Sequence, residues 1–291
     1  MKDWPSASFA VNTHIIVGLA IMIGSQTATM AGIEPFASWN TPIAWTGFII
    51  FADAIVFRAR GHSWIRSSPR EFIVLCLLSI PLWLVFEWFN LVLRNWHYIG
   101  LPENVPLRIF GYAWSFATIW PAIFEAAELI SVLRAGTARP AAATPRRPAV
   151  PATPPVALPI LGALMLGTPF VVAPTVAQYM AAPVWLGFIP LLDPINASRR
   201  EESLILDWRA GQFKRTQNLI LSGFLCGALW ELWNYWARAK WLYTVPILEN
   251  LKIFEMPLPG YLGFPAFALE CFTMYVFLRS LIRRPGRPIA L

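Results

Sequence analysis

The stretch FEWFN at positions 86–90 decides the fold, because it returns as WELWN at positions 230–234. An upstream stretch repeats as well, since WTGFI at positions 45–49 returns as WLGFI at positions 185–189. The offset between the copies stays near about 140 residues, which indicates a tandem duplication of half the chain. After FEWFN come Arg94, Trp96 and Tyr98, and after WELWN come Arg238, Trp241 and Tyr243.

The composition is that of a membrane protein. Of the 291 residues, 57% are hydrophobic, only 13% are charged and 15 are tryptophan. Soluble domains carry about twice that charged fraction, and a mean hydropathy of +0.53 is unusual for them. We therefore expect an integral membrane protein of the all-α class, a polytopic helix bundle.

Eight stretches are long or apolar enough to be considered as membrane spans, since a span needs about 20 residues. Four lie in a first repeat at 1–134 and four in a second repeat at 156–291, with an Ala/Pro/Arg-rich linker at 135–155 between them. Because each repeat has an even number of spans, the two are expected to be parallel in the membrane. The stretches are roughly Val11 to Gly32, Thr41 to Phe57, Phe72 to Leu93, Ile109 to Leu133, Val156 to Met180, Ala182 to Asn196, Asn218 to Ala237 and Gly260 to Leu281.

The basic residues predict the orientation of the bundle. Most of the 23 Lys and Arg residues fall between spans two and three, four and five, or six and seven, or at the C-terminal end. Such loops are cytoplasmic, so both termini are predicted to be cytoplasmic, in a bacterial inner membrane. The net charge of +7 is then an orientation signal, and nucleic-acid binding is not expected because the chain has no soluble basic surface.

Each repeat places a carboxylate inside an apolar span. Glu87, Asn90 and Arg94 are spaced i, i+3 and i+7, which predicts one polar stripe on a helix. An acid at that depth costs at least about 2.5–3.5 kcal/mol and usually marks a functional cavity, and burial favours its protonated form. The alternative is a structural lock, in which Glu and Asn hydrogen-bond between helices. The second stripe consists of Glu231, Asn234 and Arg238.

A second pair of acids follows a proline in the last span of each repeat. Glu125 comes after Pro121, and Glu270 comes after Pro265. Each half would then hold one carboxylate on each of two neighbouring helices, which can divide acid and base roles. The candidate catalytic residues are therefore Glu87, Glu231, Glu125 and Glu270.

The other repeated residues have two interpretations each. Asp53 and Asp193 lie near span ends and are expected to pair with loop arginines rather than to act chemically. The Trp-x-Tyr residues suit an interfacial belt, but aromatic faces beside buried acids would also stabilise a carbocation. The candidate substrate-binding residues are Asn90, Asn234, Arg94, Arg238, Trp96, Trp241, Tyr98 and Tyr243.

No metal or cofactor is expected. The three Cys and three His residues show no metal-ligand spacing. The chain also has no Gly-rich nucleotide fingerprint and no Asp-rich diphosphate motif, so the sequence gives no support for redox chemistry or prenyl transfer.

The order of these motifs resembles the integral-membrane lycopene cyclases of the carotenoid pathway. Half-units of that family carry Pro-Trp-Asp-Asn, then a Trp-Tyr, then Pro-x-Glu-Glu before an aromatic run. This chain departs from the pattern, because Glu replaces Asp, the Asn is displaced by two positions and a single Glu replaces the Glu pair. The resemblance implies a relative of membrane terpenoid cyclases. The matching residues would be Glu87 or Glu231, Asn90 or Asn234, Tyr98 or Tyr243, and Glu125 or Glu270.

Together these features predict a cofactor-independent isomerase or cyclase acting on a polyprenyl or carotenoid-like lipid. Glu231 or Glu87 would protonate a carbon–carbon double bond, and Glu270 or Glu125 would take a proton away. The alternative is a proton-coupled transporter or lipid-binding scaffold whose paired stripes line a central pathway. The expected partner is a membrane lipid or isoprenoid; the sequence leaves the oligomeric state open, and also whether the halves form one cavity or two.

Overall fold

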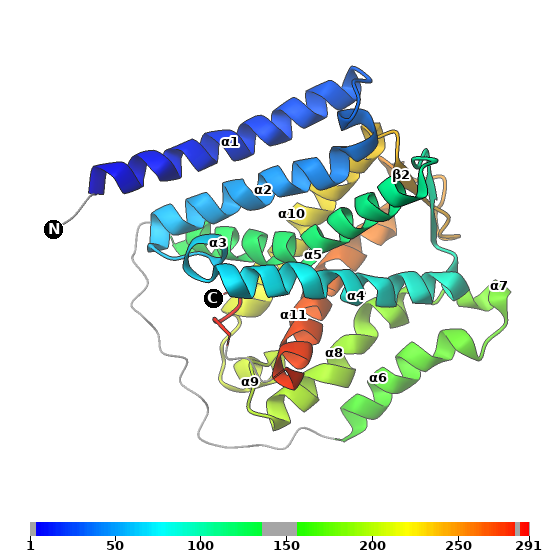
Figure 1. The fold of residues 1–291 in the computed structure, drawn as a ribbon. Coiled ribbons are helices and arrows are strands. Elements are labelled where there is room, and N and C mark those ends of the chain that lie inside the picture. The colour runs from blue at the N-terminus through cyan, green and yellow to red at the C-terminus, as the bar shows by residue number, and fades with distance from the viewer. Residues whose placement is uncertain (1–3, 136–155, 283–285, 291) are drawn as a thin grey trace.

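The structure is a computed structural model that describes residues 4–135, 156–282 and 286–290. Within these residues the chain forms eleven α-helices and four short strands, so the all-α class is confirmed. Figure 1 shows the long helices in two groups, with α1, α2, α4 and α5 in one and α6, α8 and α11 in the other. The predicted linker at 135–155 lies, apart from its first residue, outside the described part of the chain.

Five helices come from the first predicted repeat. Helix α2 packs against α1 and α5, and α5 packs in turn against α4. Helix α1 is therefore at the edge of the group and contacts mainly α2. The bounds are Trp4–Met30 for α1, Phe36–Arg60 for α2, Trp64–Ser67 for α3, Pro69–Leu93 for α4 and Val105–Ala135 for α5.

Six helices come from the second predicted repeat. Helix α8 packs against α6 and α11, and α11 packs against α10. The neighbours thus follow the order α6, α8, α11, α10, which matches α1, α2, α5, α4 in the first group. Helix α10 also packs against α5 and so joins the groups. The bounds are Ala157–Gly167 for α6, Pro174–Ala177 for α7, Ala181–Ser198 for α8, Leu204–Arg209 for α9, Lys214–Trp236 for α10 and Gly263–Leu281 for α11.

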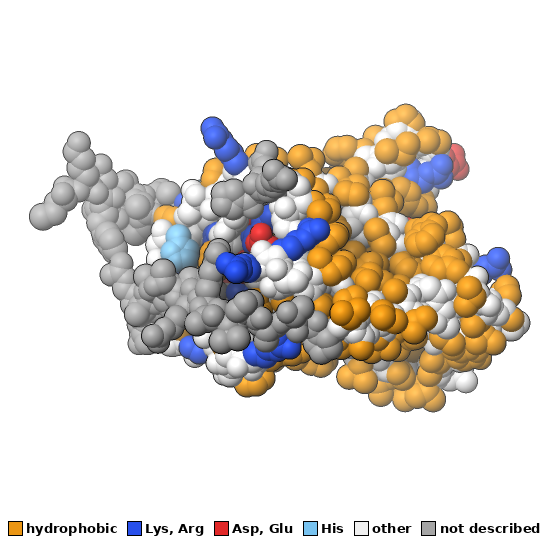
Figure 2. All heavy atoms as spheres, turned by 90° about the horizontal axis from the view of Figure 1, so that it is seen from below, with side chains coloured by type: hydrophobic (Ala, Val, Ile, Leu, Met, Phe, Trp, Pro, Cys, Tyr) orange, Lys and Arg blue, Asp and Glu red, His pale blue; other side chains and the backbone are white. Residues whose placement is uncertain are grey.

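Five segments are long and apolar enough to cross a membrane, which supports a membrane protein but does not confirm eight spans. The expected span from Val156 to Met180 is wrong as a single helix, because α6 ends at Gly167 and a 3₁₀ turn with Pro169 follows. Hydrophobic side chains cover much of the face in Figure 2, and Lys and Arg side chains gather toward one side of it. The five segments are Val11–Met30, Phe36–Arg60, Pro69–Leu93, Val105–Ala135 and Leu258–Leu281.

The glycine of the repeated W-x-G-F-I motif brings helices close together in both groups. A Cβ atom on Gly18 of α1 would lie 2.7 Å from the carbonyl oxygen of Gly47 on α2. Similarly, a Cβ atom on Gly162 of α6 would lie 2.7 Å from the carbonyl oxygen of Gly187 on α8. Small residues at helix crossings allow backbones to pack this tightly. The repeated glycine therefore serves helix packing.

Two short strands join the groups at one end of the bundle, here called the strand end. Strand β1 follows α4, strand β2 follows α10, and the two pair antiparallel. Trp96 lies opposite Tyr243, and Tyr98 lies opposite Trp241, so each Trp of the Trp-x-Tyr motif faces the Tyr of the other copy. The strands span Trp96–Ile99 for β1 and Lys240–Tyr243 for β2, and a second pair spans Lys252–Ile253 for β3 and Met256–Pro257 for β4.

Residues 286–290 join a partly buried network of charges at the opposite end, here called the basic end. Arg287 donates from Nη2 to both carboxylate oxygens of Glu128 on α5, at 2.9 and 2.7 Å. Its guanidinium group lies over the ring of Trp64 at 4.9 Å. Its backbone nitrogen donates to both carboxylate oxygens of Glu71 on α4. These contacts attach the segment to the first group of helices.

The same segment is attached to α10 of the second group. Arg215 donates from Nε to the carbonyl oxygen of Ile289 at 3.0 Å, and from Nη2 to Glu202 at 2.6 Å. Asn218 donates from Nδ2 to the carbonyl oxygen of Ala290 at 3.0 Å. Ile289 and Ala290 are fully buried. Segment 286–290 therefore clamps the two groups together at the basic end.

Candidate functional site

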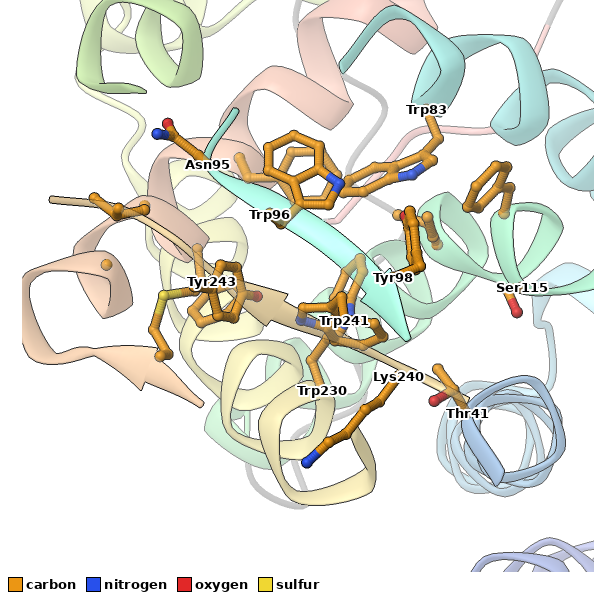
Figure 3. A pocket seen from close by; sticks show the side chains of 18 of the residues that line it. Thr41, Trp83, Asn95, Trp96, Tyr98, Ser115, Trp230, Lys240, Trp241 and Tyr243 are labelled. Carbon is orange, nitrogen blue, oxygen red and sulfur yellow. The ribbon is translucent and has the colours of Figure 1, made fainter. Parts of the chain in front are cut away.

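A cavity of about 470 Å³ lies at the strand end and is lined by residues of both groups. Figure 3 shows Trp96, Tyr98, Trp241 and Tyr243 along the two paired strands, with Trp83 and Trp230 on either side of them. Three repeated positions contribute from each copy, so the predicted repeats share this cavity. The pairs are Trp45 and Trp185, Trp96 and Trp241, and Tyr98 and Tyr243.

The wall of the cavity is mostly apolar and rich in aromatic rings. Trp83 on α4 has its ring centroid 5.6 Å from that of Trp230 on α10 and 5.8 Å from that of Phe267 on α11. Trp185 on α8 lies 5.3 Å from Phe267. Aromatic rings in this arrangement can hold an apolar chain, and their faces attract positive charge.

The carboxylate of Glu87 is bound by three side chains of the cavity wall. Its Oε1 atom accepts from Tyr98 Oη at 2.5 Å, from Trp83 Nε1 at 2.8 Å and from Trp96 Nε1 at 3.3 Å. Glu87 itself does not line the cavity but lies behind these three residues. The predicted link between the intramembrane acid and the Trp-x-Tyr motif is therefore a direct hydrogen-bond contact.

Glu231 makes the equivalent contact in the second copy. Its Oε1 atom accepts from Tyr243 Oη at 2.9 Å. The carboxyl group is fully buried, and its Oε2 atom has no hydrogen-bond partner among the described residues. The two copies thus share the Glu–Tyr pair, and they differ in that Oε2 of Glu231 is buried without a partner among the described residues.

Both tyrosines of the site are held protonated. Burial raises the pKa of Tyr98 well above its ordinary value, and the adjacent Glu87 carboxylate raises it further. Burial likewise raises the pKa of Tyr243. At neutral pH each phenol is therefore a hydrogen-bond donor that connects a carboxyl group to the cavity.

Asn90 and Asn234 fix the strands that carry these tyrosines. Asn90 donates from Nδ2 to the carbonyl oxygen of Trp96 at 2.8 Å and accepts from the backbone nitrogen of Trp96 at 3.2 Å. Asn234 makes the same two bonds with the backbone of Trp241, at 2.9 and 3.0 Å. Their amides are thus engaged with the protein backbone, and neither residue lines the cavity. In this structure they position the Trp-x-Tyr motif.

Replacing Asn234 with alanine is expected to lower the free energy of unfolding by about 1–3 kcal/mol, because two backbone groups of Trp241 lose their partner. The midpoint of thermal unfolding in detergent micelles would measure this. Gln212→Ala, at an exposed side chain, is the control and should change stability by less than about 0.5 kcal/mol. Equal losses of stability in the two variants would contradict the role of Asn234 in holding strand β2.

The helices that carry the expected polar stripes end before they reach the arginines. Helix α4 ends at Leu93, and Arg94 caps it with a left-handed backbone at φ 54°, while α10 ends at Trp236. Arg94 and Arg238 are exposed, do not line the cavity, and Arg238 pairs with Glu34 at 2.5 Å. The prediction that they continue the Glu–Asn face of a helix is therefore wrong, because the helix ends first.

Glu125 and Glu270 are fully buried in α5 and α11 and do not line the cavity. Glu270 accepts at Oε1 from the backbone nitrogen of Phe188, which belongs to the repeated W-x-G-F-I motif, at 3.0 Å. Among the described residues, both carboxyl oxygens of Glu125 lack a hydrogen-bond partner. Neither acid contacts a Glu–Tyr pair, and the structure does not bring the four expected acids into one cluster.

Asp53 and Asp193 hold short helices at the basic end. Asp53 accepts from the backbone nitrogen of Ile65 at 2.8 Å and lies 3.6 Å from Arg66, rather than pairing with Arg58. Asp193 accepts from the backbone nitrogens that begin α9 and from a serine hydroxyl. The expected pairing with a loop arginine is thus met by Asp53 with Arg66, whereas Asp193 has no such ion pair among the described residues and binds the start of α9 instead.

Several cavity residues have no role in the sequence-based prediction. Trp83 lies four positions before Glu87 on the same helix face, so the i, i+4 spacing could have identified it. Trp230 is part of WELWN, but the sequence pattern alone gives it no role in a cavity. Phe267 carries no local signal, because only tertiary packing brings it to the cavity.

Within the described part of the chain, no group of three or more His, Cys, Asp or Glu residues could hold a metal ion.

Comparison with family models, with curated proteins and with solved structures gives no match to this chain.

Proposed function

We propose that this protein is a membrane-embedded acid–base isomerase or cyclase that acts on a polyprenyl or carotenoid-like lipid. The observation that carries the proposal is the shared cavity rich in aromatic rings, in which Tyr98 connects the half-buried Glu87, and Tyr243 the buried Glu231, to the cavity space. A polyene or polyprenyl chain suits such an apolar wall.

The chemistry would consist of proton movements next to a stabilised cation. A glutamate behind the wall supplies a proton through its tyrosine to a carbon–carbon double bond of the lipid. Trp83, Trp230 and Trp185 present π-systems that attract the resulting positive charge. Loss of a neighbouring proton to the other carboxyl group then completes an isomerisation or ring closure at unchanged mass.

The membrane arrangement that we propose keeps the sequence-based topology. Helices α8 and α10, together with the broken α6–α7 segment, complete eight crossing segments with the five apolar ones. The two groups then form parallel repeats, as the matching order of helix neighbours favours. The basic end would face the cytoplasm of a bacterial inner membrane, since Arg residues concentrate in its loops.

The test is chromatography with mass detection of isoprenoid extracts from a lycopene-producing bacterial host that expresses the protein. We expect a new isomer of unchanged mass, reduced at least about a hundredfold in the Glu87→Gln, Glu231→Gln double variant. Glu103→Gln, at an exposed loop residue, is the matched control and should leave the product unchanged.

An unchanged extract from well-expressed protein would contradict action on lycopene. Proton-coupled flux in liposomes would then decide for the transporter that the sequence leaves as the alternative. The exposed positions of Arg94 and Arg238 weigh against the pathway of full stripes that this alternative needs.

A further inference from the structure

The two repeated glutamates have different surroundings although their motifs match. Three donors converge on Oε1 of Glu87, and two of them are indole N–H groups that cannot accept a proton. Donors that converge in this way favour the ionised carboxylate. Glu231 Oε1 accepts from the Tyr243 phenol, and the Trp241 indole and the Glu255 backbone also lie near the carboxyl group, but its buried Oε2 has no partner among the described residues.

The difference originates at one position of the repeat. Trp83 lies three residues before FEWFN, and the position three residues before WELWN is Gly227. The ring of Phe264 occupies the space beside this glycine, because a Cβ atom there would lie 2.2 Å from Phe264 Cδ2. The second copy therefore has no indole N–H at the place where Trp83 donates to Glu87.

We infer that the two copies have divided their roles: Glu87 is held as a carboxylate, and Glu231 is held as a neutral acid whose proton resides on the buried Oε2. A carboxylate oxygen that is buried away from water destabilises the fold unless it is paired or protonated. Because Oε2 has no partner among the described residues, protonation is what removes this cost. The assignment of resting states depends only on these contacts.

Its chemical consequence rests on the proposed function. Once the carboxyl group of Glu231 has rotated so that its O–H points at the phenol oxygen, Tyr243 gives its phenolic proton to a double bond of the lipid and takes the carboxyl proton, so Glu231 becomes a carboxylate and the lipid a carbocation. The cation then loses a proton from a neighbouring carbon to the Glu87 carboxylate through Tyr98. The lipid has gained and lost one proton, and return of a proton from Glu87 to Glu231 restores the resting state.

The assignment can be tested without any turnover, by infrared spectroscopy of the purified protein in lipid. Glu231→Gln should remove one carbonyl stretching band of a neutral carboxylic acid, while Glu87→Gln should remove none. Glu231→Asp, which keeps an acid at the position, should shift the band rather than remove it and serves if the Gln variant does not fold.

Loss of an acid band in Glu87→Gln, or an unchanged acid region in Glu231→Gln, would overturn the assignment. If the lycopene-producing host shows no product but the bands behave as expected, the proposed function fails and the division of protonation states stands. The two hypotheses are therefore tested separately.

Discussion

Replacing Arg287 with alanine is expected to lower the free energy of unfolding by about 3 kcal/mol, because the buried Glu128 would lose both hydrogen bonds to Arg287 and keep the weaker ion pair with Arg60 at 3.9 Å. The side chain of Glu128 is only 1% exposed, so water cannot replace the lost guanidinium group. Unfolding in detergent micelles, followed by circular dichroism, would measure the change.

Two further variants separate this effect from the loss of any arginine. Arg70→Ala, at an exposed side chain of α4 near the same end, should change stability by less than about 0.5 kcal/mol. Replacing both Arg287 and Glu128 with methionine should recover part of the loss, because the buried carboxylate is removed together with Arg287, while Arg60 keeps its hydrogen bond to Ser131. A single Arg287 variant as stable as the native protein would show that segment 286–290 does not hold the basic end.

Replacing Gly100 with alanine is expected to separate the two strands that form the site. A Cβ atom there would lie 2.0 Å from the carbonyl oxygen of Arg238, and the backbone has φ +63°. The left-handed conformation costs a non-glycine residue about 1–2 kcal/mol, and the steric overlap costs about 1–3 kcal/mol more. We expect a loss of stability near that sum and a loss of product, because β1 carries Tyr98.

Gly32→Ala is the matched control, because this glycine has φ +70° but nothing within 4 Å of its Cβ position. It should cost only the conformational strain, about 1–2 kcal/mol, and leave product formation intact. If both variants lose the same stability and neither loses product, the contact between Gly100 and Arg238 is not needed for the site.

The sequence predicts the helical class and the pairing of acids with aromatic residues, because both depend on local patterns. Glu87 and Tyr98, and likewise Glu231 and Tyr243, occur at nearly the same spacing and meet in space. The shared cavity needs tertiary information, because residues such as Phe267 reach it only through helix packing.

Two other features could not be read from local patterns. Helix α4 ends at Leu93, and the next residue, Arg94, has the left-handed conformation that glycine usually takes at a helix end. Because no glycine marks this end, the sequence pattern predicts that the helix continues through Arg94. The charge network at the basic end joins residues far apart in the chain, such as Glu71 and Arg287, and no spacing rule links them. Composition indicates only that these charges lie near the same membrane surface.

The register of β1 with β2 is self-complementary, because Trp96 faces Tyr243 and, in return, Tyr98 faces Trp241. This is the isologous contact that two identical chains make about a two-fold axis. The strand pairing therefore has the symmetry of a contact between two identical units, although it joins two parts of one chain. The sequences behind the strands do not keep this symmetry, because Trp83 in one part corresponds to Gly227 in the other.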